Sequence, residues 1–112
     1  MIRFMRLVIF FDLPTIKYSE RKDYRKFVKY LTNEGYIRVQ YSIYCKLCIN
    51  AQSAMGAKNK VTVNAPSNGD IRLLIISEQQ YLQIISLNNT YSFQEKITNM
   101  DRLTIIGGFD DT

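Results

Sequence analysis

A single carboxylate, Asp12, stands at the end of an apolar run near the start of the chain. The stretch LVIFFDLP, residues 7–14, places five apolar residues before this aspartate and a proline two positions after it. An acid there lies where a buried strand opens into a loop, and such loops commonly carry binding and catalytic groups. Two copies of Asp12, brought together by a two-fold axis, could share one hydrated Mg²⁺ or Mn²⁺ and activate water against a phosphodiester. A turn or capping residue is the alternative interpretation.

The segment SERKDYRKFVK, residues 19–29, carries five cations at helical spacing. Placed 100° apart, they fall within an arc of about 140° opposite the apolar residues. Arg21, Arg25 and Lys29 form one row, about 12 Å long at the helical rise. Such a row suits a phosphate backbone, because each contact releases counterions and no base sequence need be read. A solvated helix face is the alternative. The nucleic-acid-binding residues that we predict are Lys17, Arg21, Lys22, Arg25, Lys26, Lys29 and Arg38, and Lys46 could extend the patch.

The charge of the whole chain agrees with a polyanionic partner. The 112 residues carry a net charge of +5, and the sequence pI is near 9.3. Residues 1–60 hold 12 Lys or Arg against 4 Asp or Glu, whereas residues 61–112 hold 3 against 6. This asymmetry favours one surface for a polyanion and another for a different partner, such as a protein. A basic protein without a polyanion partner remains the alternative.

Several kinds of chemistry are excluded by residues that the sequence lacks. Histidine is absent, which removes a histidine general base, a histidine-activated nucleophile and imidazole metal ligands. The five glycines do not form a phosphate-binding loop. Cys45 and Cys48 form a lone CxxC with no second pair, so we expect two ordinary thiols rather than a zinc site. No apolar run approaches the ~20 residues of a membrane-spanning helix, so we expect a cytoplasmic protein without membrane contact.

Hydrophobic periodicity predicts alternating strands and helices. The helix of residues 20–33 should be capped by Ser19, end at Gly35 and pack through Tyr24, Phe27, Val28 and Leu31. Asn50 should cap a second helix that ends near residue 63. Residues 81–87 could form a helical turn and then a strand. The predicted strands are residues 4–11, 36–40, 43–48, 71–77 and 103–106.

This order predicts an α+β, ferredoxin-like βαββαβ fold, with an antiparallel sheet and both helices on one face. We expect a single domain over residues 1–112, with a core of about residues 1–78 and a strand-rich tail of residues 79–112. The second sheet face has no helix to cover it, although the strands are apolar on both faces. A homodimer through the open sheet face is therefore expected, and the tail strands could add to a partner's sheet edge.

Four segments together resemble CRISPR-associated protein two, the small core adaptation protein of CRISPR systems. They are MRLVIFFDLP, ERKDYRKFVKYLTNEGY, VQYSIYCKL and DIRLLIIS, and they cover nearly the whole chain in one order. The length and the SERKDYRKF segment look most like the variant that accompanies Cas9-type effector systems. One departure is Cys45, which follows Tyr44 where the family often has an acid. That departure bears on nuclease activity more than on the fold.

The resemblance implies a ferredoxin-like homodimer with a Mg²⁺-dependent nuclease site built from Asp12 of each protomer. It also implies a scaffold for spacer acquisition that bridges two dimers of a larger CRISPR integrase subunit and holds duplex DNA. In the family, this bridging need not depend on nuclease activity. The residues that the resemblance assigns to partner docking are Leu87, Leu103, Thr104, Ile105 and Ile106.

Two other functions remain open from the sequence. A stand-alone, toxin-like endoribonuclease would use the same fold and the same aspartate with a metal ion. A ferredoxin-like regulatory module that binds a small ligand is a third hypothesis, but such a module needs no row of cations. The sequence does not decide between DNA and RNA as the preferred nucleic acid. It also does not decide whether Arg21 or Arg25 is the principal cation.

Overall fold

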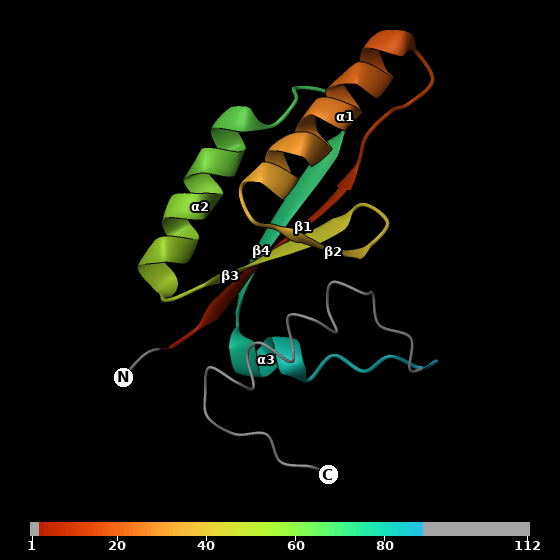
Figure 1. Ribbon diagram of the computed structural model, residues 1–112. Helices are drawn as coiled ribbons and strands as arrows, with labels where there is room; N and C mark the ends of the chain where they lie inside the picture. Colours follow the sequence, from red (N-terminus) through yellow and green to blue (C-terminus); the bar gives the residue numbers. More distant parts are fainter. Residues whose placement is uncertain (1–2, 89–112) are drawn as a thin grey trace.

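Four strands and three helices follow one another along residues 3–88, the part of the chain that the computed structural model describes. Figure 1 shows their arrangement. The predicted strand at residues 103–106, with its docking residues, lies outside the described part. The elements are β1 (Met5–Asp12), α1 (Tyr18–Asn33), β2 (Ile37–Gln40), β3 (Ile43–Cys48), α2 (Ala51–Asn64), β4 (Asp70–Ser77) and α3 (Glu78–Leu82).

The strands form one sheet in the order β2-β3-β1-β4, and every neighbouring pair is antiparallel. The β1-α1-β2 unit therefore has β3 between its two strands, and the β3-α2-β4 unit has β1 between its two strands. This is the split βαβ arrangement. The predicted α+β, ferredoxin-like fold is confirmed. None of the helices in residues 3–88 has the length and apolar content needed to cross a bilayer.

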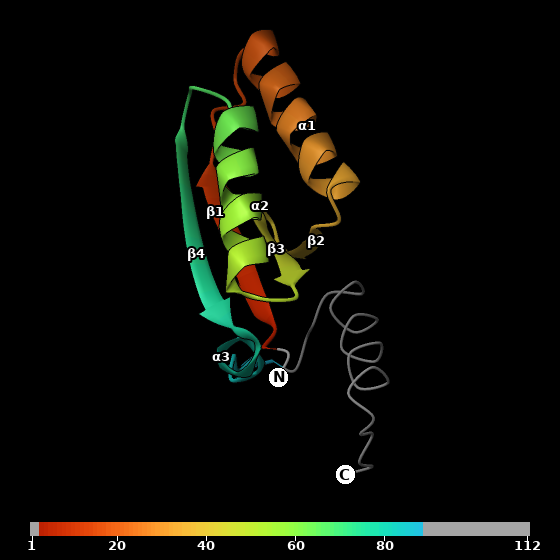
Figure 2. The same ribbon diagram turned by 90° about the vertical axis from the view of Figure 1, so that its left-hand side faces the viewer.

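The core lies between the sheet and the first two helices. Figure 2 shows α1 and α2 on the same side of the sheet. Alternate residues of β1, Leu7, Ile9 and Phe11, point toward these helices and are buried. Phe27 of α1 packs on Phe11 with ring centroids 5.2 Å apart, as the periodicity of this helix predicts. Each such buried side chain contributes about 1.5–3 kcal/mol of hydrophobic free energy.

The start of α1 differs from the prediction. The helix begins at Tyr18, so Ser19 lies inside its first turn and is not the cap. The backbone N–H of Lys17 donates instead to Oε1 of Glu20 at 2.8 Å, which fixes the helix start two residues earlier. The predicted end is confirmed, because Gly35 has φ +89°, the left-handed conformation that glycine adopts without strain.

The segment after β4 also differs from the prediction. Helix α3 begins at Glu78 rather than Tyr81, because the Ser77 hydroxyl accepts a hydrogen bond from the Gln80 N–H at 3.1 Å. No strand follows it within residues 83–88. Helix α3 covers one end of the sheet face that α1 and α2 leave open, where Glu78 and Tyr81 contact Arg6 of β1.

Candidate functional site

Asp12 is the last residue of β1, as the sequence predicts to within one position. It lies on the sheet face that α1 and α2 do not cover, in register with Asp70 of β4. The residue is exposed, and no residue of the described chain donates a hydrogen bond to its carboxylate. This aspartate therefore performs no visible turn or capping role within residues 3–88, and its oxygens are accessible to a ligand.

The turn before β4 holds the backbone of Asp12 in place. Gly69 has φ +85°, and a Cβ atom at this position would lie 2.6 Å from Cδ2 of Leu13 and 2.7 Å from the carbonyl oxygen of Asp12. Only glycine allows this close approach. The Asp12 end of β1 is consequently fixed by a neighbouring backbone rather than left as a loose strand end.

Asp70 supplies a second carboxylate at the same end of the sheet. Residues that are opposite in an antiparallel pair have Cα atoms about 4.5–5.5 Å apart, so Asp70 is the nearest strand neighbour of Asp12. Its Oδ2 lies 3.0 Å from Nη2 of Arg72. This hydrogen-bonded contact raises the pKa of Arg72. Asp70 was not predicted from the sequence as a site residue, although antiparallel pairing of β1 with β4 places the two aspartates together.

A shallow pocket of about 300 Å³ surrounds these carboxylates. Tyr41 on its rim is 71% exposed. The Tyr41 ring stacks on Tyr24 of α1 at 6.4 Å, and the Arg38 guanidinium lies 5.6 Å from the Tyr41 centroid. The predicted cation Arg38 is therefore placed near this pocket. The lining residues are Phe10, Phe11, Asp12, Tyr41, Ser42, Ile43, Asp70 and Arg72.

The donor set at this end of the sheet fits a hydrated hard cation. Within residues 3–88 there is no group of three or more His, Cys, Asp or Glu side chains that could enclose a metal ion. Mg²⁺ commonly keeps several waters and uses only one or two carboxylates from the protein. Asp12, with Asp70 beside it or with a second copy of Asp12, meets that requirement. Neither imidazole nor thiolate is present in the pocket lining to favour Zn²⁺.

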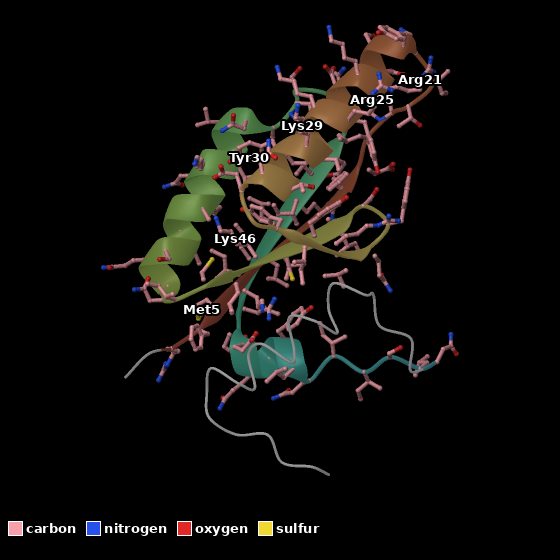
Figure 3. The ribbon with its side chains drawn as sticks, viewed as in Figure 1. Met5, Arg21, Arg25, Lys29, Tyr30 and Lys46 are labelled. Atoms are coloured by element: carbon pink, nitrogen blue, oxygen red, sulfur yellow. The ribbon has the colours of Figure 1, made fainter. Side chains whose placement is uncertain are left out.

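The predicted cationic row is present on α1. Figure 3 shows Arg21, Arg25 and Lys29 in succession along this helix, and all three are exposed. Lys22 and Lys26 are exposed beside them. None of the five forms an ion pair within the described residues. The row extends along the middle of α1, from Arg21 to Lys29, and the last turn of the helix has no basic residue.

Two of the predicted cations have additional or different roles. The Arg21 guanidinium donates to the carbonyl oxygen of Thr15 at 3.4 Å and also to that of Ile16. Arg21 therefore holds the loop between β1 and α1, whereas Arg25 projects from the helix without such a contact. Lys46 does not extend the row, because it lies on the helix-covered face of the sheet, 5.5 Å from the ring centroid of Tyr36.

A buried cluster at the other end of β1 was not predicted from the sequence. Arg6 is 1% exposed, although it lies on the open face. Its Nε and Nη2 donate to the two carboxylate oxygens of Glu78 at 2.7 and 3.1 Å, and its guanidinium carbon lies 4.3 Å from the Tyr81 ring centroid. Nη1 lies 3.4 Å from Sγ of Cys45. We call Arg6, Cys45, Glu78 and Tyr81 the Arg6 cluster.

The two cysteines are buried, and they form no disulfide within the described residues. Cys45 is in register with Val8 of β1 and belongs to the open face, while Cys48 belongs to the helix-covered core. Their side chains are therefore on opposite sides of the sheet, and no metal cluster involves either of them within the described residues.

The fold and the site together define a small ferredoxin-like α+β protein with an acidic strand end and a cationic helix. Comparison with known proteins specifies the family. The family described as CRISPR associated protein Cas2 matches residues 5–84, and the chain belongs to it. The resemblance deduced from the sequence motifs is thereby confirmed, and the comparisons support a CRISPR-related nuclease role.

Individual relatives cover most of the chain. The CRISPR-associated endoribonuclease Cas2 of Ligilactobacillus salivarius is 48% identical over 77 residues, which are 69% of this chain and 76% of that protein. The protein of the same name from Streptococcus mutans is 43% identical over 106 residues, 92% of this chain and 94% of that protein. The Campylobacter jejuni protein of that name is 35% identical over 103 residues, 92% of this chain and 72% of that protein.

Proposed function

We propose that this chain is a CRISPR adaptation protein, a homodimeric scaffold that binds duplex DNA and bridges dimers of a larger integrase subunit. The observation that carries the proposal is the exposed cationic row of α1, which forms no ion pair within residues 3–88. The like charges of the row repel one another unless a polyanion neutralises them. A rigid rod of cations favours a phosphate backbone and needs no base contacts.

The open sheet face supports the homodimer. Phe10 of β1 is 37% exposed and Leu74 of β4 is 50% exposed, and both lie on that face with Val8 and Ile43. Helix α3 and the Arg6 cluster already cover the other end, so the uncovered apolar surface lies toward Asp12. A second copy placed there would bury the apolar side chains. The same pairing favours a two-fold axis near the Asp12 ends.

Metal-dependent phosphodiester cleavage is the second part of the proposal. Asp12 and Asp70 provide carboxylate oxygens at a fixed strand end, and the exposed Tyr41 ring at the pocket rim can stack on an unpaired base. A bound Mg²⁺ or Mn²⁺ would supply a nucleophile from water and positive charge for the phosphate. Arg72 neutralises one of the two carboxylates, which lowers their repulsion of a nucleic acid.

The salt dependence of duplex affinity tests the proposal that the chain binds DNA. Replacing Arg25 and Lys29 with Gln should weaken binding and flatten the plot of log K against log[salt] by about 0.9 for each phosphate that the protein no longer neutralises. The matched control replaces Lys58 and Lys60 of α2 with Gln, which removes the same charge from another surface. An identical slope in both double variants would show that α1 carries only a solvated face. Arg21→Gln is measured separately, because Arg21 also holds the loop before α1.

Light scattering tests the dimer. We expect a dimer at micromolar concentration and a monomer for Leu74→Lys, which places a charge in the proposed interface. Val63→Lys is the matched control, because Val63 is also an exposed apolar residue but lies on α2. A monomer for the unmutated chain at all concentrations, or a dimer for Leu74→Lys, contradicts pairing through the open face.

Cleavage assays with and without chelator test the proposed nuclease site. Asp12→Asn keeps the side-chain shape and should reduce Mg²⁺-dependent cleavage by a factor of about 10² or more. Dimerisation, duplex binding and integration with the larger subunit should persist. Cleavage that survives Asp12→Asn would place the site elsewhere. Loss of integration with duplex binding intact would overturn the scaffold function. If the unmutated chain cleaves neither RNA nor DNA, the scaffold is its whole function.

A stand-alone endoribonuclease is the second candidate. The observation that favours it is the exposed Tyr41 ring beside Asp12, since stacking on aromatic rings is typical of single-stranded RNA recognition. RNA cleavage that is abolished in Tyr41→Ala, with duplex DNA binding absent in the unmutated chain, supports this candidate. Duplex binding that depends on α1 supports the scaffold.

A further inference from the structure

Among the described residues that line the pocket around Asp12, only Arg72 is a cation. Arg72 is opposite Phe10 in the register of β1 and β4, one step along the open face from the pair of Asp12 and Asp70. Such diagonal neighbours of an antiparallel pair lie about 7–8 Å apart, which is within reach of a long side chain. The Arg72 guanidinium is therefore long enough to act at Asp12 as well as at Asp70.

The contact between Arg72 and Asp70 can open at little cost. Nε and Nη2 of Arg72 lie 3.1 and 3.0 Å from Oδ2 of Asp70. The side chains of Arg72 and Asp70 are 69% and 58% exposed. An ion pair in this setting is weak, because water and salt screen it. The guanidinium can consequently leave Asp70 when another anion competes for it.

The charges of the pocket favour this exchange once a divalent cation is bound. Two carboxylates and one guanidinium carry one net negative charge, which repels a phosphodiester. A divalent cation at the two carboxylates reverses the sign of this total and also competes with Arg72 for Asp70. One phosphodiester then balances the remaining positive charge. The edge of the guanidinium that holds Asp70 also matches two oxygens of a phosphate, because the planar fork of arginine binds carboxylates and phosphates alike.

We propose that Arg72 is a phosphate-binding residue, which releases Asp70 and binds a phosphodiester of a nucleic acid when a divalent cation occupies the two aspartates. This inference rests on the proposed nuclease function and adds a substrate contact to it. In the sheet, β1 lies between β4 and the β2–β3 hairpin that carries Tyr41. A single strand that stacks a base on Tyr41 can therefore pass Asp12 and reach Arg72 with a backbone phosphate.

Binding of the metal ion and binding of the nucleic acid should be coupled through Arg72. The metal ion attracts Asp70, and the phosphate attracts the guanidinium, so each ligand opens the ion pair for the other. Such coupling is reciprocal, and the nucleic acid should therefore tighten metal binding by the same factor by which the metal tightens nucleic-acid binding. A residue that only stabilises the end of β4 would not produce this coupling.

Isothermal titration calorimetry with Mn²⁺ tests the proposal, with and without a single-stranded oligonucleotide whose phosphorothioate linkages slow cleavage. Arg72→Gln should tighten Mn²⁺ binding to the free protein roughly two- to fivefold, because Asp70 loses the cation that competes for it. The same variant should lose most of the gain in Mn²⁺ affinity that the oligonucleotide gives the unmutated chain. Its Mg²⁺-dependent cleavage should fall about tenfold or more. Tighter metal binding together with slower cleavage cannot result from partial unfolding.

Two further variants separate the role of Arg72 from a general effect of charge. Lys58→Gln removes one positive charge from α2, outside the pocket, and should change neither the Mn²⁺ affinity nor the coupling. Arg72→Lys keeps the charge without the planar fork, so it should keep the Mn²⁺ affinity of the unmutated chain and recover only part of the coupling. Equal Mn²⁺ affinity and equal coupling in Arg72→Gln and Lys58→Gln would overturn the proposal.

The outcomes also distinguish this inference from the nuclease function. Mn²⁺ binding that Asp12→Asn abolishes and Arg72→Gln leaves unchanged would keep the metal site and contradict the role of Arg72. Coupling that depends on Arg72, in a chain that cleaves neither RNA nor DNA, would support Arg72 and contradict the nuclease. Absence of Mn²⁺ binding by the unmutated chain contradicts both. In light scattering Arg72→Gln should remain a dimer, and a monomer would assign Arg72 to the dimer interface instead.

Discussion

Arg6 and Asp12 lie on the same face of the same strand, yet their surroundings are opposite. They are six residues apart, about 20 Å at about 3.3 Å per residue. Arg6 is 1% exposed and is held by Glu78, Tyr81 and Cys45. Asp12 is exposed and accepts no hydrogen bond from any described residue. A charge whose partners all come from its own chain serves the fold, whereas a charge that the fold leaves in water is available for a ligand.

The physical difference between the two ends is desolvation. Removing a guanidinium from water costs several kcal/mol, which only a well-placed counter-charge and hydrogen bonds offset. Glu78 and Tyr81 provide that compensation for Arg6 because α3 folds back over the sheet. No element covers the Asp12 end within residues 3–88. Variants at each end should therefore change different properties, stability at Arg6 and activity at Asp12.

Glu78→Gln should have the largest effect on stability. The variant leaves the Arg6 charge buried without a counter-charge, and such a change typically lowers the free energy of unfolding by about 3–5 kcal/mol. Urea unfolding at neutral pH measures it. The control is Arg6→Met combined with Glu78→Leu, which removes both charges and should recover much of the loss. A loss below about 1 kcal/mol in Glu78→Gln would mean that the pair is hydrated in solution.

Gly69→Ala should have the next largest effect, at the Asp12 end. The substitution adds a Cβ that contacts the backbone at Asp12 and also strains φ, which together should cost about 1–3 kcal/mol. Gly35→Ala is the matched control, because Gly35 has a similar positive φ but no atom within 4 Å of the added Cβ. Equal losses in the two variants would show that the contact with Asp12 does not restrain the strand end.

Glu34→Gln should cost much less than Glu78→Gln, although the two ion pairs have the same N–O distance of 2.7 Å. The side chains of Lys60 and Glu34 are 59% and 25% exposed, so solvent screens this pair more than the buried one. The hydrogen bond with Lys60 lowers the pKa of Glu34, so its small contribution is present at neutral pH. That contribution is lost as the pH falls below about 4.3 and through the lowered pKa. Urea unfolding across this pH range, compared with the variant, measures it.

Asp12→Asn should have the smallest effect on stability. Surface substitutions away from structural contacts usually change the free energy of unfolding by less than about 0.5 kcal/mol. Because no described residue contacts the Asp12 carboxylate, the unfolding midpoint should match that of the unmutated chain. A loss of more than about 1 kcal/mol would assign Asp12 a structural role and would weaken its assignment to a ligand.

Local patterns were sufficient to predict most of the fold. The apolar run before Asp12 indicated β1, and the spacing of Phe27 and Leu31 indicated the buried face of α1. Gly35 marked the end of that helix. These features depend on neighbours within a few residues, so the sequence itself specifies them. The position of Asp12 at the end of a strand follows from the same local information.

Contacts between distant residues were not predictable from such patterns. Arg6 and Glu78 are separated by 72 positions, and each alone resembles an ordinary surface charge. Lys46 was a candidate extension of the cationic row, but the pairing of β3 places it beneath the helices. In both cases the deciding partner lies far away in the sequence. The start of α1 differs, because Glu20 accepts a hydrogen bond from the N–H of Lys17 only three residues away, and two local capping patterns competed there.

The Arg6 cluster has a mechanical consequence for the edge of the sheet. Within residues 3–88, β4 is an edge strand of the sheet, and tension on the chain that follows it would begin to separate it from β1 at its last residue. At that point the Glu78 N–H donates to the carbonyl oxygen of Phe4 at 3.0 Å, and the Glu78 carboxylate binds Arg6. A pulling force applied to the chain after Leu82 must break these two interactions of Glu78 before it can stretch the hydrogen bonds between β4 and β1. The sheet is thus reinforced against tension at the end where the chain departs from it.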